Sequence, residues 1–296
     1  MNIFNSKLNL ILFNFAELIY TVCIYSREGM INQEFYRNAR AYDIAFSDRE
    51  FDVECDFLEY AAEKFGKFNL NGLGNKSFAE LGCGPGRHAR EMARRGWKST
   101  ALDISQDMIE FAVGEAQKKN LHIEPVVADM CDYTLSEPVS LTATLMESIS
   151  HLVTNEQMVS HFQSVARNTV PGGIYVIEAT HPLFFFPDNE PNTWVSRRGK
   201  TRVEITFGLP TDEYDSVKQQ WMVTSRLKIR ENGNPEVVVE NHYPIRWWLA
   251  QEMLALIELA DVFDKYWFYG SMYTIPPVGL DDSEDSDAMV IILRVK

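Results

Sequence analysis

The pattern of hydrophobic and polar positions predicts alternating strands and helices through the middle of the chain. Short apolar runs, which favour buried strands, begin at Phe78 and recur up to Ala179. They lie at 78–81, 99–102, 122–128, 140–145 and 174–179. The segments between them place apolar residues at i, i+3, i+4 and i+7, which predicts helices with one buried face. Strands that alternate with helices in this way are typical of an α/β sheet.

After Ala179 the hydrophobic period changes to two, which predicts an antiparallel β cap inserted after strand five. Every second residue between 223 and 229 is apolar or small, a polar turn follows at 231–235, and 237–242 returns as the second strand of a hairpin. The other predicted elements are a third cap strand at 202–207, a helix at 246–260 and two final strands at 262–269 and 288–295.

The N-terminal part consists of an apolar segment followed by a predicted helical region at 34–68. Residues 8–25 are mostly apolar, but two asparagines and Glu17 interrupt them, and a single lysine precedes them. These features disfavour a secretory signal and a stable membrane span. Three interpretations stay open: a docked helix, a membrane-surface segment, or a non-native extension ahead of a start at Met30. The first and the third are favoured.

A glycine-rich loop follows the first predicted strand. Residues 80–86 read E-L-G-C-G-P-G, and a helical pattern begins directly after them. Glycine lets the backbone turn tightly and approach a ligand without a Cβ atom, while the N-terminus of the following helix attracts anionic groups. Asp103 ends the next strand, where a carboxylate can accept hydrogen bonds from ribose hydroxyls. Together the loop and this acid indicate an adenosine-type cofactor.

The E-x-G-x-G-x-G pattern with Arg87 and His88 after it resembles motif I of class I S-adenosylmethionine (SAM) methyltransferases, and its small-molecule, glycine/sarcosine N-methyltransferase-like branch in particular. The resemblance implies a Rossmann-like, seven-stranded mixed sheet with helices on both faces. It also implies SAM as cofactor. The implied cofactor-binding residues are Tyr42, Glu80, Gly82, Cys83, Gly84, Gly86, Asp103, Ile104, Met108, Asp129, Met130 and Met146.

Some of these roles compete with ordinary structural ones. The resemblance places Tyr42 over the methionine end of SAM, yet a packing tyrosine is equally compatible with the sequence. Asp129 matches the acid that accepts a hydrogen bond from the adenine amine, although an Asp there can also begin a turn. Met108 either touches the adenine or packs in the core, which is the more frequent fate of such a methionine.

Acceptor-binding residues are expected after strands four and five, because ligands of open α/β sheets bind beyond the carboxyl ends of the strands. His151 and His181 are the candidate general bases. Glu147 and Glu178 are candidates to anchor a cationic amine, and Trp194 is a candidate acceptor contact through cation–π interaction or stacking. Each of these residues has a structural alternative: packing for the histidines and Trp194, and a polar strand end for Glu178.

The sequence predicts five consecutive segments. They are the apolar extension 1–29, a helical cover 30–76, the SAM-binding core 77–180, the β cap and substrate region 181–245, and the final helix with a C-terminal β-hairpin 246–296.

Composition and charge make some partners, compartments and metal sites less favourable. The net charge of −14 disfavours nucleic acid as a partner, because binding phosphates requires basic surface. The four cysteines form no paired spacing, which favours reduced thiols in a cytoplasmic protein, and the histidines show no metal-ligand spacing. A homodimer is left open.

The sequence therefore predicts a SAM-dependent methyltransferase that acts on a small-molecule acceptor, an amine or a hydroxyl. One alternative is a non-catalytic SAM-binding or partner-binding protein, which the apolar N-terminus keeps open. The other is an NAD-dependent oxidoreductase. Arg87 in place of the last spaced glycine, and the lack of a Tyr-x-x-x-Lys pair, make that second alternative less favourable.

Overall fold

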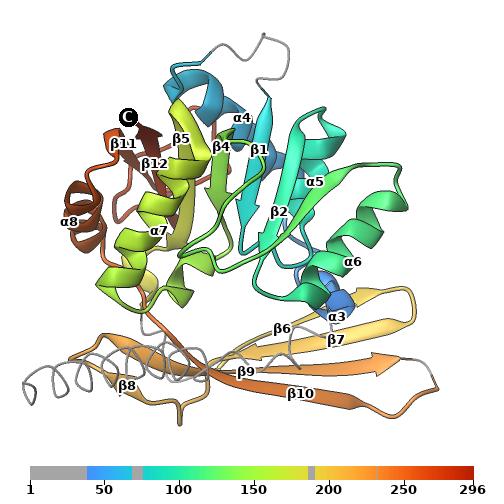
Figure 1. Ribbon diagram of the computed structural model, residues 1–296. Helices are drawn as coiled ribbons and strands as arrows, with labels where there is room; N and C mark the ends of the chain where they lie inside the picture. The colour runs from blue at the N-terminus through green and yellow to red at the C-terminus, as the bar shows by residue number, and fades with distance from the viewer. Residues whose placement is uncertain (1–38, 69–75, 186–190, 232) are drawn as a thin grey trace, which may run out of the picture.

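The computed structural model of the chain describes residues 39–68, 76–185, 191–231 and 233–296. The predicted apolar extension 1–29 and the first part of the helical cover lie outside the described residues. Two sheets organise the rest (Figure 1): a seven-stranded sheet A in the body and a separate antiparallel sheet B beside the end where strands β1, β2 and β4 finish.

Sheet A has the strand order β11-β12-β5-β4-β1-β2-β3. Its strands are β1 (Ser77–Leu81), β2 (Lys98–Asp103), β3 (Ile123–Val127), β4 (Val139–Thr144), β5 (Thr169–Thr180), β11 (Phe263–Tyr269) and β12 (Ala288–Val295). The strands β1 to β5 pair in parallel, whereas β12 runs antiparallel to both of its neighbours. This arrangement confirms the predicted seven-stranded mixed sheet and its reversed final hairpin.

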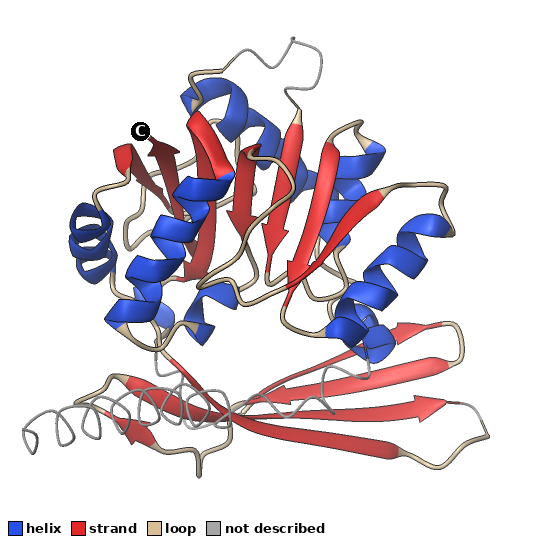
Figure 2. Cartoon of the chain, viewed as in Figure 1, coloured by secondary structure: helices blue, strands red, loops and turns tan. Residues whose placement is uncertain are grey.

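Helices cover both faces of sheet A (Figure 2), as predicted. The α-helices are α3 (Ala39–Ala45), α4 (Phe51–Phe65), α5 (Arg87–Arg94), α6 (Gln106–Gln117), α7 (Asn155–Asn168) and α8 (Ala250–Ala260), with short 3-10 turns η1 (Ser148–His151) and η2 (Pro182–Phe184). Phe162 of α7 packs on one face of the sheet and Phe57 of α4 on the other, both fully buried. Burying such a side chain stabilises the fold by about 1.5–3 kcal/mol.

Sheet B confirms the antiparallel cap after strand five. Its strands are β6 (Asn192–Arg198), β7 (Thr201–Phe207), β8 (Tyr214–Asp215), β9 (Gln220–Glu231) and β10 (Val237–Ile245). They follow the order β10-β9-β7-β6, with β8 paired to β9. Ala41 and Ile44 of α3 pack against Val203, Ile205 and Leu227 of this sheet. The cap is therefore held to the body through the helical cover.

Two predicted boundaries are wrong. Strand five was predicted to begin at residue 174, but β5 already begins at Thr169 and carries residues 171–173 through a register shift, with Gly172 at a φ of 77°. The predicted helix at 246–260 begins only at Ala250. The reason is that Arg246 and Trp248 donate hydrogen bonds to the carbonyls of Ser150 and Leu152, which ties the preceding residues to the loop after β4.

No helix in the described part of the chain is long and apolar enough to span a membrane.

Candidate cofactor and acceptor site

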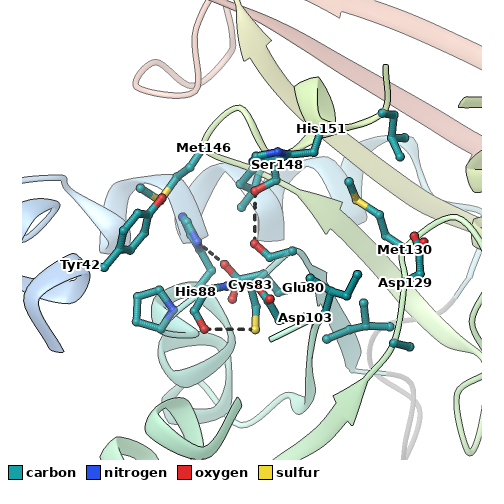
Figure 3. A pocket seen from close by; sticks show the side chains of 18 of the residues that line it. Tyr42, Glu80, Cys83, His88, Asp103, Asp129, Met130, Met146, Ser148 and His151 are labelled. Atoms are coloured by element: carbon teal, nitrogen blue, oxygen red, sulfur yellow. Dashed lines mark hydrogen bonds and ion pairs between the residues drawn. The ribbon is translucent and has the colours of Figure 1, made fainter. Parts of the chain in front are cut away.

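A cavity of about 270 Å³ lies at the carboxyl ends of the strands of sheet A. Many of the residues predicted to bind cofactor or acceptor line it (Figure 3): Tyr42, Glu80, Gly82, Cys83, Gly84, Asp103, Ile104, Asp129, Met130, Met146 and His151. They come from segments that are far apart in sequence. The sheet topology brings them together, because β1, β2, β3 and β4 all end at this edge.

The glycine loop uses backbone conformations that favour glycine. Gly82, Gly84 and Gly86 have φ values of 63°, 50° and 67°, a region that costs other residues free energy. Gly84 lines the cavity, and a Cβ atom there would lie in van der Waals contact with the Tyr42 ring, at 3.7 Å. A Cβ atom on Gly86 would lie 2.8 Å from the Cβ atom of Ala112. Gly84 thus keeps ligand space open, whereas Gly86 allows α5 and α6 to pack closely and does not line the cavity.

Asp103 lies at the end of β2 and is almost fully buried. One carboxylate oxygen accepts the backbone N–H of Gly84 at 2.8 Å, and the other accepts that of Ser105 at 2.9 Å. Burial raises the pKa of this carboxyl above its usual value, against the effect of these hydrogen bonds. The two bonds fix the carboxylate beside the glycine loop, in the place predicted for ribose recognition.

The loop after β3 is held from α7. Asp129 accepts the N–H of Cys131 at 2.8 Å, so it does form the turn that the sequence left open, while still lining the cavity. His161 contacts the carbonyl of Met130 at 2.8 Å, and Ser164 donates to the carbonyl of Cys131 at 2.8 Å. Sequence reasoning missed these α7 side chains. In the sequence these two polar residues are visible only as an interruption of the apolar stripe on the buried face of the helix.

The loop after β4 contains two consecutive non-glycine residues in the left-handed region, Met146 (φ 52°) and Glu147 (φ 63°). Met146 lines the cavity and faces Tyr42 (Figure 3), and its N–H donates to Glu178 at 2.8 Å. Glu147 accepts hydrogen bonds from the N–H and hydroxyl of Thr180, and burial raises its pKa to about 7. Such conformations persist where surrounding contacts impose them, often at functional sites.

The structure does not place Glu147 or Glu178 among the residues that line the cavity. Glu178 forms an ion pair with Arg49, and Glu147 faces Thr180. The two carboxylates therefore hold the loop after β4, which speaks against their predicted role as direct anchors of the acceptor.

The two candidate bases differ in position. His151 lines the cavity, its ring lies 5.4 Å from that of Tyr243, and burial lowers its pKa to about 4. His181 does not line it: Nδ1 accepts the N–H of Leu183 at 3.1 Å, and Nε2 contacts the carbonyl of Asp281 at 3.0 Å. An Nδ1 that accepts requires Nε2 to donate. Both ring nitrogens of His181 are engaged, so the structure speaks against His181 as the base.

Trp194 and Met108 also lie outside the cavity lining. The Trp194 indole donates to the carbonyl of Ala45 at 2.8 Å, and its ring packs 5.3 Å from that of Phe46. Trp194 thus fastens α3 to β6, while Phe46 reaches the cavity. Met108 is fully buried in α6. Both residues therefore occupy packing positions, which is the structural alternative that the sequence left open for each of them.

Comparison with known proteins adds to this geometry. Residues 78–173 match a family model described as a methyltransferase domain. This part of the chain is a methyltransferase domain. The predicted class I SAM-dependent family is thereby supported, while the glycine/sarcosine-like branch stays a prediction. The fold confirms the same conclusion, because the reversed β11–β12 hairpin completes the predicted class I sheet.

Relatives of the methyltransferase domain include a dTDP-3-amino-3,4,6-trideoxy-alpha-D-glucopyranose N,N-dimethyltransferase from Streptomyces venezuelae. It is 27% identical over 138 residues, which are 45% of this chain and 55% of the relative. The chain spans about half the length of the curated relatives it matches first.

Solved structures share the fold over most of the chain. The crystal structure of DesVI from Streptomyces venezuelae has a TM-score of 0.66 at 18% identity and covers 88% of this chain and 98% of that one. The SAM-bound amino pentose methyltransferase CalS10 from Micromonospora echinaspora has a TM-score of 0.59 at 14% identity and covers 90% and 98%. The resemblance therefore includes sheet B as well as the methyltransferase domain.

Asp43 is a residue of the site that sequence reasoning missed. It directly follows Tyr42, is almost fully buried, and pairs with Arg87 at 2.6 Å, Arg90 at 3.2 Å and Arg198 at 2.5 Å. Burial alone would raise the pKa of Asp43, but the arginines hold it below its usual value. These pairs join α3, α5 and β6, and so hold Tyr42 over the glycine loop. The only local signal in the sequence is an acid directly after the predicted tyrosine.

Proposed function

We propose that this protein transfers a methyl group from SAM to an amine on a small molecule, with an amino sugar as the acceptor class. The observation that carries the proposal is a single cavity that collects the glycine loop, Asp103, the loop after β3 and His151. The named relative, an N,N-dimethyltransferase of a dTDP-amino sugar, supports the acceptor class.

The residues present fit SAM. Gly84 leaves open the space that a Cβ atom would fill, and the Asp103 carboxylate is fixed by backbone N–H groups beside it. We infer that Asp103 and Ile104 hold the ribose, Asp129 and Met130 the adenine, and Tyr42 and Met146 the methionine end. Bound SAM supplies an electrophilic methyl group on a sulfonium centre. Of the acids that line the cavity, Glu80 pairs with His88, and the carboxylates of Asp103 and Asp129 favour that positive charge.

The remaining work of the chain is positioning. Holding the nucleophile and the methyl group in line can supply about 7–11 kcal/mol of the barrier reduction. With a pKa near 4, the His151 imidazole is neutral at pH 7. A neutral ring nitrogen can accept an N–H hydrogen bond from a neutral amine, which turns the nitrogen lone pair toward the methyl group, and it can take a proton after transfer.

The two alternatives from the sequence are less well supported. In dinucleotide-binding Rossmann folds the sheet is mostly parallel and its last strands extend it in one direction, whereas here the antiparallel β12 lies between β5 and β11. A non-catalytic SAM-binding protein needs no acceptor chemistry, yet His151 lines the same cavity as the glycine loop.

Calorimetry and a transfer assay test the proposal. The full chain should bind SAM, and should not bind NAD. Methyl label from SAM should then pass to members of a panel of amino sugars, with glycine, sarcosine and the corresponding hydroxyl sugars as comparison acceptors. Binding of NAD without SAM would refute the cofactor. SAM binding with transfer to glycine or sarcosine alone would favour the glycine/sarcosine-like branch and refute the acceptor class.

The remaining expectations stay proposals. We infer a cytoplasmic protein that does not bind nucleic acid, from the net charge of −14 and the unpaired cysteine spacing. A homodimer and the segment boundaries at 30, 77, 181 and 246 are predictions from the sequence.

A further inference from the structure

A chain of buried charged side chains runs beside the cavity. Glu80 contacts His88 Nδ1 at 2.8 Å, and His88 Nε2 contacts Glu54 at 2.6 Å. Arg49 then pairs with Glu54 at 2.5 Å through Nε and with Glu178 through its terminal nitrogen. Glu54 and His88 are fully buried, Glu80 and Glu178 are almost so, and the Arg49 side chain is 23% exposed. We refer to these five residues as the buried ion chain.

The buried ion chain connects two loops of the cavity. At one end, Glu80 accepts the N–H of Ala89 at 2.8 Å, which fixes the start of α5 behind the glycine loop. At the other end, Glu178 accepts the N–H of Met146 at 2.8 Å. Met146 has a φ of 52° and lines the cavity, as Tyr42 does (Figure 3). The buried ion chain therefore ends on the backbone of Met146, one of the two residues of this loop with an unfavourable conformation.

The charges alternate along the chain. Both nitrogens of His88 face carboxylates, and only an imidazolium can donate to both. Although burial opposes it, these carboxylates raise the pKa of His88 to about 9. Acid and base then alternate from Glu80 through His88, Glu54 and Arg49 to Glu178. Each buried charge has a partner, as burial of ions requires.

Stability alone is a weak reason for such an arrangement. Buried ion pairs lose so much hydration that apolar replacements are often as stable or more stable. Arg49 lies in the short connection between α3 and α4, and Tyr273, from the connection between β11 and β12, donates to Glu54 at 2.7 Å. Separate segments of the chain thus converge on the glycine loop and the loop after β4. In the loop after β4, they hold the backbone of Met146 in place.

We propose that Arg49 is a positioning residue for the methionine end of the cofactor: through Glu178 it holds the left-handed backbone of Met146 at the cavity, which Tyr42 also lines. The inference rests on the proposed function, because it takes SAM as the ligand. Arg49 does not line the cavity and acts through Glu178. Its loss should affect the aminobutyrate and sulfonium part of the ligand and spare the adenosine part, which Asp103 and the loop after β3 hold.

The test compares two probes on the full chain by calorimetry. SAM carries the methionine end, whereas 5′-methylthioadenosine keeps the adenosine and the thioether without the aminobutyrate. Arg49→Met should weaken SAM binding at least tenfold and 5′-methylthioadenosine binding less than threefold. Arg49→Lys, which restores the cation, should recover most of the SAM affinity. Glu178→Gln keeps an amide oxygen for the Met146 N–H, so its loss should be intermediate.

Arg294→Met is the matched control. Arg294 is also a mostly buried arginine that pairs with an acid, Asp264 at 2.7 Å, but neither lines the cavity. The Arg294→Met variant should have a lower melting temperature, and its affinities for SAM and 5′-methylthioadenosine should be unchanged. Equal losses for the two probes, or wild-type SAM affinity in a folded Arg49→Met or Glu178→Gln variant, would overturn the positioning role. A wild-type protein that binds neither probe would instead refute the proposed function.

Discussion

The two halves of the cavity are built in different ways. The cofactor half consists of consecutive strand ends: the glycine loop after β1, Asp103 at the end of β2 and Asp129 after β3. The acceptor half combines His151 after β4 with Pro244 from sheet B and Phe46 from the cover. The first half follows from local sequence and sheet topology, whereas the second depends on how separate layers pack. Function is accordingly easier to infer for the cofactor than for the acceptor.

The sharpest test of the cofactor half is Gly84→Val. Gly84 has a φ of 50°, and a side chain there would enter the cavity toward Tyr42. SAM binding measured by calorimetry should fall by more than about a hundredfold, because the valine occupies ligand space. Gly96→Val is the control: Gly96 has a φ of 84°, and a Cβ atom there meets nothing within 4 Å. It carries similar backbone strain and should bind SAM normally. A Gly84→Val variant with normal affinity would refute the cofactor position.

Asp103→Ala should have the next largest effect. Loss of hydrogen bonds from the ribose hydroxyls to a carboxylate should weaken SAM binding by about 1.5–3 kcal/mol. Asp103→Asn keeps one acceptor oxygen for a backbone N–H and should lose less. Circular dichroism should show that both variants fold. Unchanged SAM affinity in folded Asp103→Ala would contradict the assignment.

The same residue predicts a pH dependence of cofactor binding. Burial raises the pKa of the Asp103 carboxyl, and the ionised form is the better acceptor. SAM affinity should therefore be full above this raised pKa and decline as the pH falls through it, at a higher pH than an exposed Asp would give. Calorimetry across the acidic range checks this, and Asp103→Ala should remove the decline. A decline that persists in that variant would have another origin.

His151→Ala tests the acceptor half. We expect turnover with an amino sugar to fall at least tenfold, with SAM affinity nearly unchanged, because the proposed role of His151 is toward the acceptor and not the cofactor. The part of the loss that comes from removing the amine's proton should vanish as the pH rises through the acceptor's own pKa, whereas the part that comes from orienting the neutral amine should remain. With its pKa lowered to about 4, His151 itself should add no acidic limb above pH 5. Wild-type turnover at every pH would make His151 a packing residue.

Local sequence patterns were sufficient for most of the fold. Apolar runs located the parallel strands of sheet A, and an alternating pattern located the β9–β10 hairpin of sheet B, whereas β6 and β8 were not predicted. Thr154 and Gln157 form the capping box at the start of α7. The boundaries that failed, at 171–173 and 246–249, are set by tertiary contacts. Gly172 packs against Lys67, and Trp248 donates to Leu152. Neither contact leaves a periodic trace in the sequence.

The site divides in the same way. Glycines and acids at strand ends could be assigned because topology brings such positions together. The roles of Glu178 and His181 could not be assigned, since their partners Arg49 and Asp281 lie 129 and 100 residues away in sequence. A charged or imidazole side chain near a strand end can either face the ligand or hold a loop, and long-range pairing decides between the two.

Trp194→Phe gives the smallest expected effect and decides whether Trp194 contacts the acceptor or only packs against α3. The variant loses the hydrogen bond to Ala45 but keeps an aromatic ring beside Phe46. The free energy of unfolding should fall by about 1 kcal/mol, measured by chemical denaturation, while the KM for an amino sugar stays within twofold. Phe46→Ala, which removes a ring that lines the cavity, should raise that KM more. If Trp194→Phe raises the KM and Phe46→Ala does not, Trp194 contacts the acceptor as the sequence predicted, and the cap itself forms the acceptor half.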